Sequence, residues 1–188
     1  MSRPLIAKVG GSLFDLPDLK SRLQKWLTTI DSRPTTIVAG GGPAVDVVRS
    51  LHAKHQLTDE LSHWMAVRMM TVTGTFLAGM LDVPLVGEPR MGLAGVQVLD
   101  VYTFLVGDEG RPEALPHGWD VSSDAIAARV AEWLDGDLVL MKSIVPPPNN
   151  DWQAAARAGC VDPMLPPVVE RSKIKVEWVN LRQSEWAG

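Results

Sequence analysis

Short apolar runs alternate with helical repeats of apolar residues in the first third of the chain. Residues 4–9 form an apolar run that ends at a glycine pair, which predicts a buried strand. Apolar residues then recur at helical spacing through residues 16–30, and the same order follows in residues 35–51, with three glycines between strand and helix. Two consecutive units of strand, glycine loop and helix favour a parallel sheet covered by helices.

The rest of the chain continues this alternation. A third helix is expected to begin at Thr58, whose hydroxyl can cap it, and to end near Gly79. Its expected buried face consists of Leu61, Met65, Met69, Val72 and Phe76. Further along, the pattern predicts short strands around 96–106, a helix capped by Ser122 or Ser123, a strand over 137–142, short helices at 151–158 and 164–171, and a last strand over 175–180.

Composition agrees with one globular domain. The chain has 188 residues, 46% apolar and 21% charged, with a mean hydropathy of +0.05. No linker divides it, so we expect a single domain over 1–188. A net charge of −4 gives no electrostatic footprint for nucleic acid, and no run of about 20 apolar residues predicts a membrane span. The single Cys160 cannot form an internal disulfide, which agrees with a cytoplasmic location.

The first candidate site is the segment Lys8-Val9-Gly10-Gly11-Ser12. It follows a strand at the edge where open parallel sheets bind their ligands. Glycine lets the backbone approach an anion closely, and a nearby ammonium adds a positive charge. A tight turn with a lysine that extends to solvent explains the same segment equally well.

The second candidate is Gly40-Gly41-Gly42-Pro43. Three glycines cost conformational entropy that a simple turn does not need, and Pro43 suits the first turn of a helix whose free N–H groups attract anions. The segment matches neither the Walker A loop nor the dinucleotide fingerprint. We therefore expect phosphate binding by a different architecture.

Further candidates lie in the second half. Ser122, Ser123 and Asp124 precede a helix, where they can serve as an ordinary cap or place Asp124 to orient phosphate-binding lysines. Lys142 ends an apolar strand and is either a strand-end charge or a second phosphate contact. His63 is more often a packed histidine than an acid or a ligand.

Taken in order, Lys8-x-Gly10-Gly11-Ser12, Gly40-Gly41-Gly42 and Ser122-Ser123-Asp124 resemble the motifs of the amino acid kinase family, over residues 5–142. The resemblance implies a three-layer αβα sandwich with a mostly parallel sheet, ATP with Mg²⁺ as donor, and a carboxylate or phosphate oxygen as acceptor. It also implies a homo-oligomer. Residues 61–70, 117–124 and 178–180 are similar to the kinases of methanofuran biosynthesis, which phosphorylate an aminomethylfuran phosphate.

Carried over residue by residue, the resemblance makes Lys8 and Asp124 catalytic, with Lys8 stabilising the transferring phosphoryl group and Asp124 positioning Lys8. Phosphate or nucleotide binding falls to Gly10, Gly11, Ser12, Ser123 and Lys142. Substrate binding falls to Gly40, Gly41, Gly42, His63 and Trp119. The acceptor-binding part is expected over about 1–120 and a shortened nucleotide-binding part over about 121–188.

The sequence departs from this family after residue 142. Members usually carry a Thr-Asp-Val-Asp-Gly-like run there, whereas this chain has Lys142-Ser143-Ile144-Val145-Pro146. The main hypothesis is a small-molecule kinase acting on a phosphate monoester. The alternatives are a weakly active or inactive binding or assembly subunit, and a carboxylate kinase of the acetylglutamate or aspartate type, for which only Arg68 and Arg90 offer a positive group.

Overall fold

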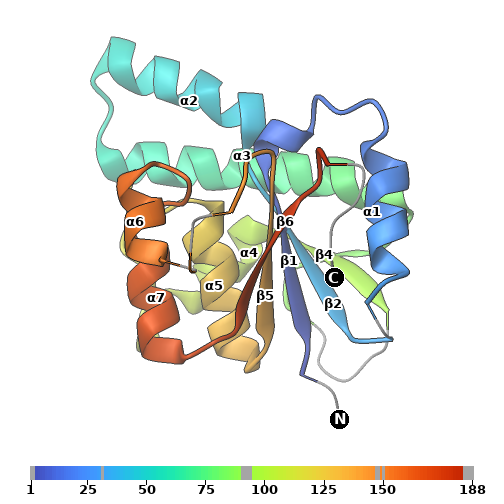
Figure 1. Ribbon diagram of the computed structural model, residues 1–188. Helices are drawn as coiled ribbons and strands as arrows, with labels where there is room; N and C mark the ends of the chain where they lie inside the picture. The colour runs from blue at the N-terminus through green and yellow to red at the C-terminus, as the bar shows by residue number, and fades with distance from the viewer. Residues whose placement is uncertain (1–2, 31, 90–94, 147–148, 150, 184–188) are drawn as a thin grey trace.

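The computed structural model describes residues 3–30, 32–89, 95–146, 149 and 151–183. It confirms the α/β fold class: a six-stranded sheet in the order β3-β4-β2-β1-β5-β6, in which every described strand pair is parallel (Figure 1). The strands are β1 Leu5–Val9, β2 Thr35–Ala39, β3 Leu85–Val86, β4 Val96–Leu99, β5 Asp137–Lys142 and β6 Val176–Asn180. The helices are η1 Gly11–Leu13 (3₁₀), α1 Leu19–Leu27, α2 Gly42–His55, α3 Asp59–Leu81, α4 Val101–Asp108, α5 Ser123–Leu134, α6 Trp152–Arg157 and α7 Leu165–Ser172.

The two faces of the sheet carry separate apolar cores, because successive strand residues point to opposite faces. On one face, Ile6, Leu138 and Leu140 pack with α4, α5, α6 and α7. On the other, Ala7 and Val139 pack with α1 and η1. Long α3 contributes residues to both cores and lies across the end of the sheet where the strands terminate (Figure 1). The result is helix, sheet and helix in three layers.

Helix α3 begins as expected, because the Thr58 hydroxyl accepts a hydrogen bond from Leu61 N at 3.3 Å. The prediction of its buried face is wrong for three of the five residues, whereas Met65 and Met69 are partly buried against a small apolar cluster. Leu61, Val72 and Phe76 are 49%, 58% and 49% exposed, and the helix buries a neighbouring set that includes small and polar residues. The buried set is Ser62, His63, Ala66, Val67, Met70, Thr73, Gly74, Leu77, Ala78 and Leu81.

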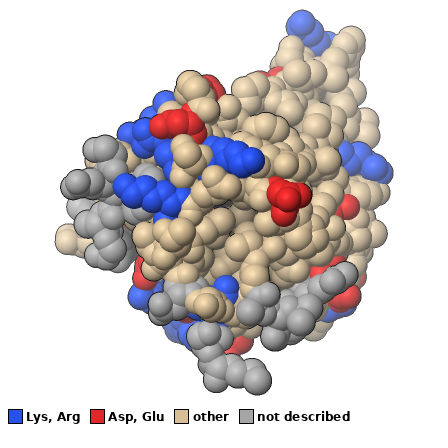
Figure 2. Space-filling model, turned by 90° about the vertical axis from the view of Figure 1, so that its right-hand side faces the viewer, with Lys and Arg blue, Asp and Glu red and all other residues tan. Residues whose placement is uncertain are grey.

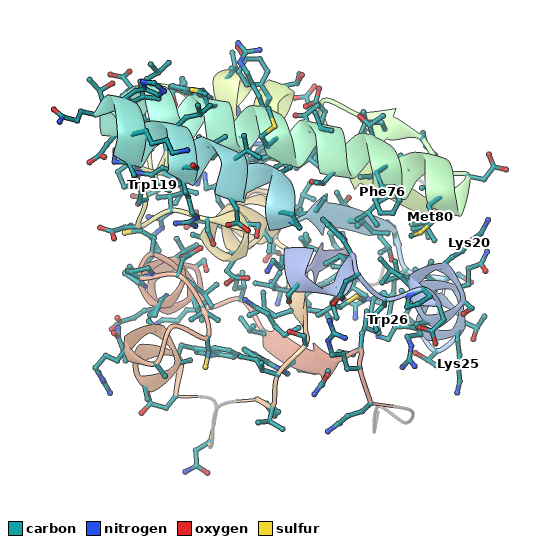
Figure 3. All side chains as sticks on the ribbon, turned by 90° about the horizontal axis from the view of Figure 1, so that it is seen from above. Lys20, Lys25, Trp26, Phe76, Met80 and Trp119 are labelled. Carbon is teal, nitrogen blue, oxygen red and sulfur yellow. The ribbon has the colours of Figure 1, made fainter. Side chains whose placement is uncertain are left out.

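This burial also explains the hydropathy of α3. Among the described residues, α3 is the one helix long and apolar enough to cross a membrane, with a mean hydropathy of 1.2. Because it packs on β2, β4 and α4, its apolar character is that of a core helix. Figure 3 shows Phe76 and Met80 near the C-terminal end of α3, on the same side of the molecule as Trp26 of α1, with Trp119 near the opposite end.

A second prediction is wrong in part. Strands were expected around 96–106, but only β4 is a strand there, and residues 101–108 form α4. The cause is Asp100, whose carboxylate accepts hydrogen bonds from Thr103 N at 3.4 Å and Thr103 Oγ1 at 2.6 Å. This cap begins a helix in a segment whose residue types favour strands.

Candidate functional site

Three charged side chains meet in the protein interior. Lys8 Nζ lies 2.8 Å from Asp124 Oδ1, and Lys142 Nζ lies 2.6 Å from Asp124 Oδ2. Their side chains are only 5%, 4% and 11% exposed for Lys8, Asp124 and Lys142. We call these three residues the charge centre. The structure thus brings together Lys8, Asp124 and Lys142, which the sequence placed far apart.

Strand pairing and a helix start create this arrangement. Strands β1 and β5 are neighbours, with Lys8 opposite Leu140, and both lysines project from the face of the sheet that α5 covers. Asp124 is the second residue of α5, and its carboxylate lies between the two lysine ammonium groups of these strands. Lys142 Nζ also donates to the Cys160 carbonyl at 3.0 Å.

The charge centre holds more positive than negative charge. Burial would raise the pKa of the Asp124 carboxyl, but the ammonium groups of Lys8 and Lys142 outweigh it and the pKa lies below its usual range. Burial, together with the charge of Lys8, lowers the pKa of Lys142 to about 8. With both lysines protonated, one positive charge is not balanced inside the centre, so the site favours an anion.

The two glycine loops pack against each other directly above this centre. A Cβ atom on Gly11 would lie 2.2 Å from Gly42 N, and one on Gly40 would lie 2.6 Å from Gly11 N. Gly42 has φ +52°, a conformation that side chains disfavour. A Cβ atom on Gly10 would lie 2.9 Å from the Met141 carbonyl oxygen and 3.7 Å from Lys8 Nζ, so this position has no room for a side chain. These glycines are required by close backbone approach.

A cleft of about 500 Å³ opens over the glycine loops. Its wall includes the start of α2, where Gly42 and Ala44 have N–H groups without a helical partner. It also includes the side chains of Arg49 and Arg182, which add positive charge, and of Asp15 and Asp46. The lining contains seven of the expected site residues or their neighbours: Gly11, Ser12, Gly40, Gly41, Gly42, Ser122 and Ser123.

Ser12 ties the first glycine loop to the second half of the chain. Its hydroxyl lies 2.9 Å from Ser143 Oγ, and its carbonyl accepts a hydrogen bond from Arg182 Nη2 at 2.8 Å. Arg182 also pairs with Asp15 at 2.5 Å. The rim of the cleft is therefore held by contacts between the loop after β1 and the segments after β5 and β6.

Trp119 lies at the border of this cleft, while His63 lies apart from it. The Arg49 guanidinium, which lines the cleft, sits 4.7 Å from the centre of the Trp119 ring. His63 is buried and stacks on His117 with ring centres 5.0 Å apart, next to Trp64. Burial lowers the pKa of His63, so the ring is neutral at pH 7. The geometry gives His63 packing contacts and no place in the cleft lining.

Sequence reasoning missed Arg49, Arg182 and Asp162. The Asp162 carboxylate bonds the first residues of α5, although Ser122 or Ser123 was expected to cap that helix; Ser122 makes no side-chain cap bond to α5. An Asp-Pro pair before a helix is a recognisable capping signal, so the sequence could have predicted that Asp162 caps α7. Arg49 is an exposed helical arginine without any such signal.

A second cleft of about 300 Å³ lies away from the glycine loops and shares no lining residue with the first. It is bounded by α4 and α5 side chains, chiefly Phe104 and Trp133. Figure 2 shows the side of the molecule on which α1 lies in Figure 1, and on it basic side chains gather beside acidic ones.

Comparison with solved structures supports the same fold. The chain is similar to uridylate kinase from Archaeoglobus fulgidus (TM-score 0.61, 15% identity, 93% of this chain and 89% of that one) and to UMP kinase from Ureaplasma parvum (0.66, 14%, 97% and 91%). It is also similar to aspartate kinase from Synechocystis (0.62, 15%, 97%), of which it covers 39%. No family model and no curated protein sequence matches the chain. The chain therefore has the fold of amino acid kinase structures.

Proposed function

We propose that this protein is a small-molecule kinase that transfers the γ-phosphate of ATP to a phosphate monoester. The observation that carries the proposal is the charge centre lying directly below two interlocked glycine loops. Its one positive charge that Asp124 does not balance, next to loops in which glycines let the backbone approach closely, fits the phosphate groups of ATP. Bound ATP with its Mg²⁺ would supply the phosphoryl group and further charge neutralisation.

The residues of the chain would bind and orient rather than form covalent intermediates. The amide of Gly11, with Ser12 and Ser123, would hold the donor phosphates. The Gly10 amide, expected from the sequence to join them, already donates to the Met141 carbonyl at 2.9 Å. The start of α2 at Gly41 and Gly42 would hold the acceptor phosphate, because free N–H groups and the helix dipole favour anions. An acceptor phosphate oxygen gains the terminal phosphoryl group and ADP leaves. The acceptor oxygen is already an anion, so no catalytic base is required.

Lys8 and Lys142 would neutralise the charge that spreads over the phosphoryl oxygens, the contribution that dominates phosphoryl transfer. Asp124 would hold both ammonium groups in place through its two oxygens, at 2.8 and 2.6 Å. Since the pKa of Lys142 is lowered to about 8, its ammonium is still the main form at pH 7. The centre is therefore charged correctly under neutral conditions.

For the acceptor we propose an aminomethylfuran-type phosphate, in line with the similar segments. Such a molecule carries a phosphate, a flat ring and an ammonium group. The cleft offers a partner for each of these groups. The start of α2 would bind the phosphate, Trp119 with Arg49 would contact the ring, and Asp46 would pair with the ammonium. His63 is not part of this set.

Two other functions have specific observations in their favour. Ile144 and Val145, where family members carry a polar nucleotide-binding run, are 43% and 66% exposed, which favours a binding subunit without transfer activity. A carboxylate kinase needs a cation for its substrate, and Arg49 supplies one. Of the cations expected from the sequence, Arg68 is bonded to the Tyr102 hydroxyl at 2.6 Å, and Arg90 lies outside the described residues.

Isothermal titration with ATP–Mg²⁺ and with ADP tests the proposal. We expect binding below millimolar concentration, and no binding would overturn the kinase function in favour of the binding subunit. If nucleotide binds, ADP release is measured with a panel of phosphate monoesters, including aminomethylfuran phosphates, and of carboxylates. Turnover with carboxylates alone would replace the proposed acceptor class.

A further inference from the structure

The loop between α6 and α7 contains a buried carboxylate that bonds two helix starts at once. Asp162 Oδ2 accepts hydrogen bonds from Ser122 N at 3.0 Å, Ser122 Oγ at 2.7 Å and Ala125 N at 2.9 Å. Its other oxygen, Oδ1, accepts from Met164 N at 3.1 Å and Leu165 N at 2.9 Å. Asp162 is 8% exposed, so these five donors replace water.

This carboxylate performs the task of an N-cap residue from far along the chain. An N-cap side chain normally bonds the second or third amide of its own helix, and Ala125 N is the third amide of α5. Ser122 occupies the cap position but makes no such bond, and turns its hydroxyl to Asp162 instead. The start of α5 therefore depends on a residue 40 positions later.

The same loop also contacts the charge centre. Two residues before Asp162, the Cys160 carbonyl accepts a hydrogen bond from Lys142 Nζ at 3.0 Å. Asp124, the partner of Lys142, lies between the two α5 residues that Asp162 bonds, Ser122 and Ala125. Residues 160–162 thus fix both ends of the Lys142–Asp124 ion pair.

We propose that Asp162 is a positioning residue for phosphoryl transfer, which sets the start of α5 so that Asp124 aligns Lys8 and Lys142. This inference rests on the proposed function and extends it to the segment after β5, where the sequence departs from the family pattern. A second buried carboxyl close to Asp124 costs free energy, because burial and the charge of Asp124 both raise its pKa, and the five hydrogen bonds to Asp162 offset part of that cost. Misplacement of a reacting group by 1 Å costs about 10²-fold in rate.

The test compares Asp162→Asn with Asp151→Asn. The first variant keeps the side-chain shape but replaces one accepting oxygen by an amide group. The second makes the same change from carboxylate to amide at the exposed N-cap of α6, where Asp151 Oδ1 accepts from Ala154 N at 2.8 Å. Two quantities are measured: kcat and acceptor KM, and the ionisation midpoint of Lys142 Nζ by NMR of ¹⁵N-lysine-labelled protein.

For Asp162→Asn we expect a roughly 10- to 100-fold loss of kcat with acceptor KM changed less than about threefold. We also expect the Lys142 midpoint to fall, because Asp124 moves away while burial remains. Asp151→Asn should leave both quantities unchanged. A folded Asp162→Asn with wild-type kcat and midpoint overturns the inference.

A variant that does not fold and a wild-type protein without transfer activity lead to different conclusions. If Asp162→Asn does not fold, Ser122→Ala removes only the 2.7 Å hydroxyl bond, and it should shift both quantities in the same direction by less. An unchanged Ser122→Ala then counts against the inference. If the wild-type protein transfers no phosphate, the proposed function fails, and the Lys142 midpoint alone decides the role of Asp162.

Discussion

The charge centre and the cleft above it are neighbours, but they differ in the groups that form them. The charge centre consists of three buried side chains, in which each lysine ammonium lies within 2.8 Å of an Asp124 oxygen. The cleft is lined largely by glycine backbone and by side chains at the surface, such as Arg49 and Arg182. In the proposed function the first region acts on the transition state and the second on binding. Mutations in the two regions should therefore separate kcat from KM.

The largest effect is expected from Lys8→Ala, which removes an ammonium from the charge centre. We expect kcat to fall by on the order of 10³-fold, because a buried charge aimed at the phosphoryl oxygens is lost. Steady-state ADP release measures the change. Lys175→Ala is the control, since that lysine also lies beside a sheet strand but forms an exposed ion pair with Glu177.

The fold of Lys8→Ala is checked by circular dichroism, because the substitution leaves Asp124 with one partner instead of two. Activity within tenfold of wild type in a folded variant would remove Lys8 from the mechanism. In that case the difference between the two regions would disappear.

Gly11→Ala tests the cleft at its tightest point. The new Cβ would lie 2.2 Å from Gly42 N and 2.4 Å from Gly42 Cα, so the two glycine loops must separate. We expect affinity for inorganic phosphate to fall more than about tenfold and stability to fall by about 1–3 kcal/mol, as in overpacked cores. Titration calorimetry and thermal unfolding measure the two changes.

The matched control for Gly11→Ala is Gly79→Ala on α3, where a Cβ would meet nothing within 4 Å. That variant should bind phosphate as wild type does and gain up to about 1 kcal/mol of stability, because alanine favours helix. Equal phosphate affinity in both variants would show that the glycine loops do not hold the anion.

The pH dependence of kcat tests the charge centre by a smaller effect. The pKa of Lys142 is lowered to about 8 by burial and by Lys8, so its ammonium loses a proton as pH rises through that value. We expect kcat to decline above pH 8. Lys142→Arg keeps its charge throughout this range, so its kcat, although lower, should stay level to pH 10. If kcat of Lys142→Arg declines with the same midpoint, the decline comes from the titration of another group.

The sequence predicted the parts of the site that rest on local pattern. Glycine loops after strands and a lysine at a strand end need no knowledge of distant residues, and the structure places Gly11 against Gly42 and Lys8 against Asp124. The parallel sheet was also predicted, since alternating strands and helices permit few other arrangements.

Features that depend on distant contacts could not be predicted. The buried face of α3 is displaced from the most apolar positions, because the buried Ser62 and Thr73 find hydrogen-bond partners in His52 and the Gly40 carbonyl. The start of α4 follows from the capping by Asp100, which outweighs residue preference. The cap of α5 comes from Asp162, and no local rule pairs residues 122 and 162.

Arg49→Ala should have the smallest effect and separates recognition from catalysis. The Arg49 guanidinium lies against Trp119 and adds positive charge to the cleft, so its loss should raise acceptor KM severalfold, about 1 kcal/mol for an exposed cation–aromatic contact. Because Arg49 does not touch the charge centre, kcat should stay within twofold. Arg49→Lys keeps the charge but loses the planar stack on Trp119. If Arg49→Lys has the acceptor KM of the wild type, charge alone recruits the acceptor. If its KM is raised as in Arg49→Ala, the stacked pair forms the wall that a flat ring would contact.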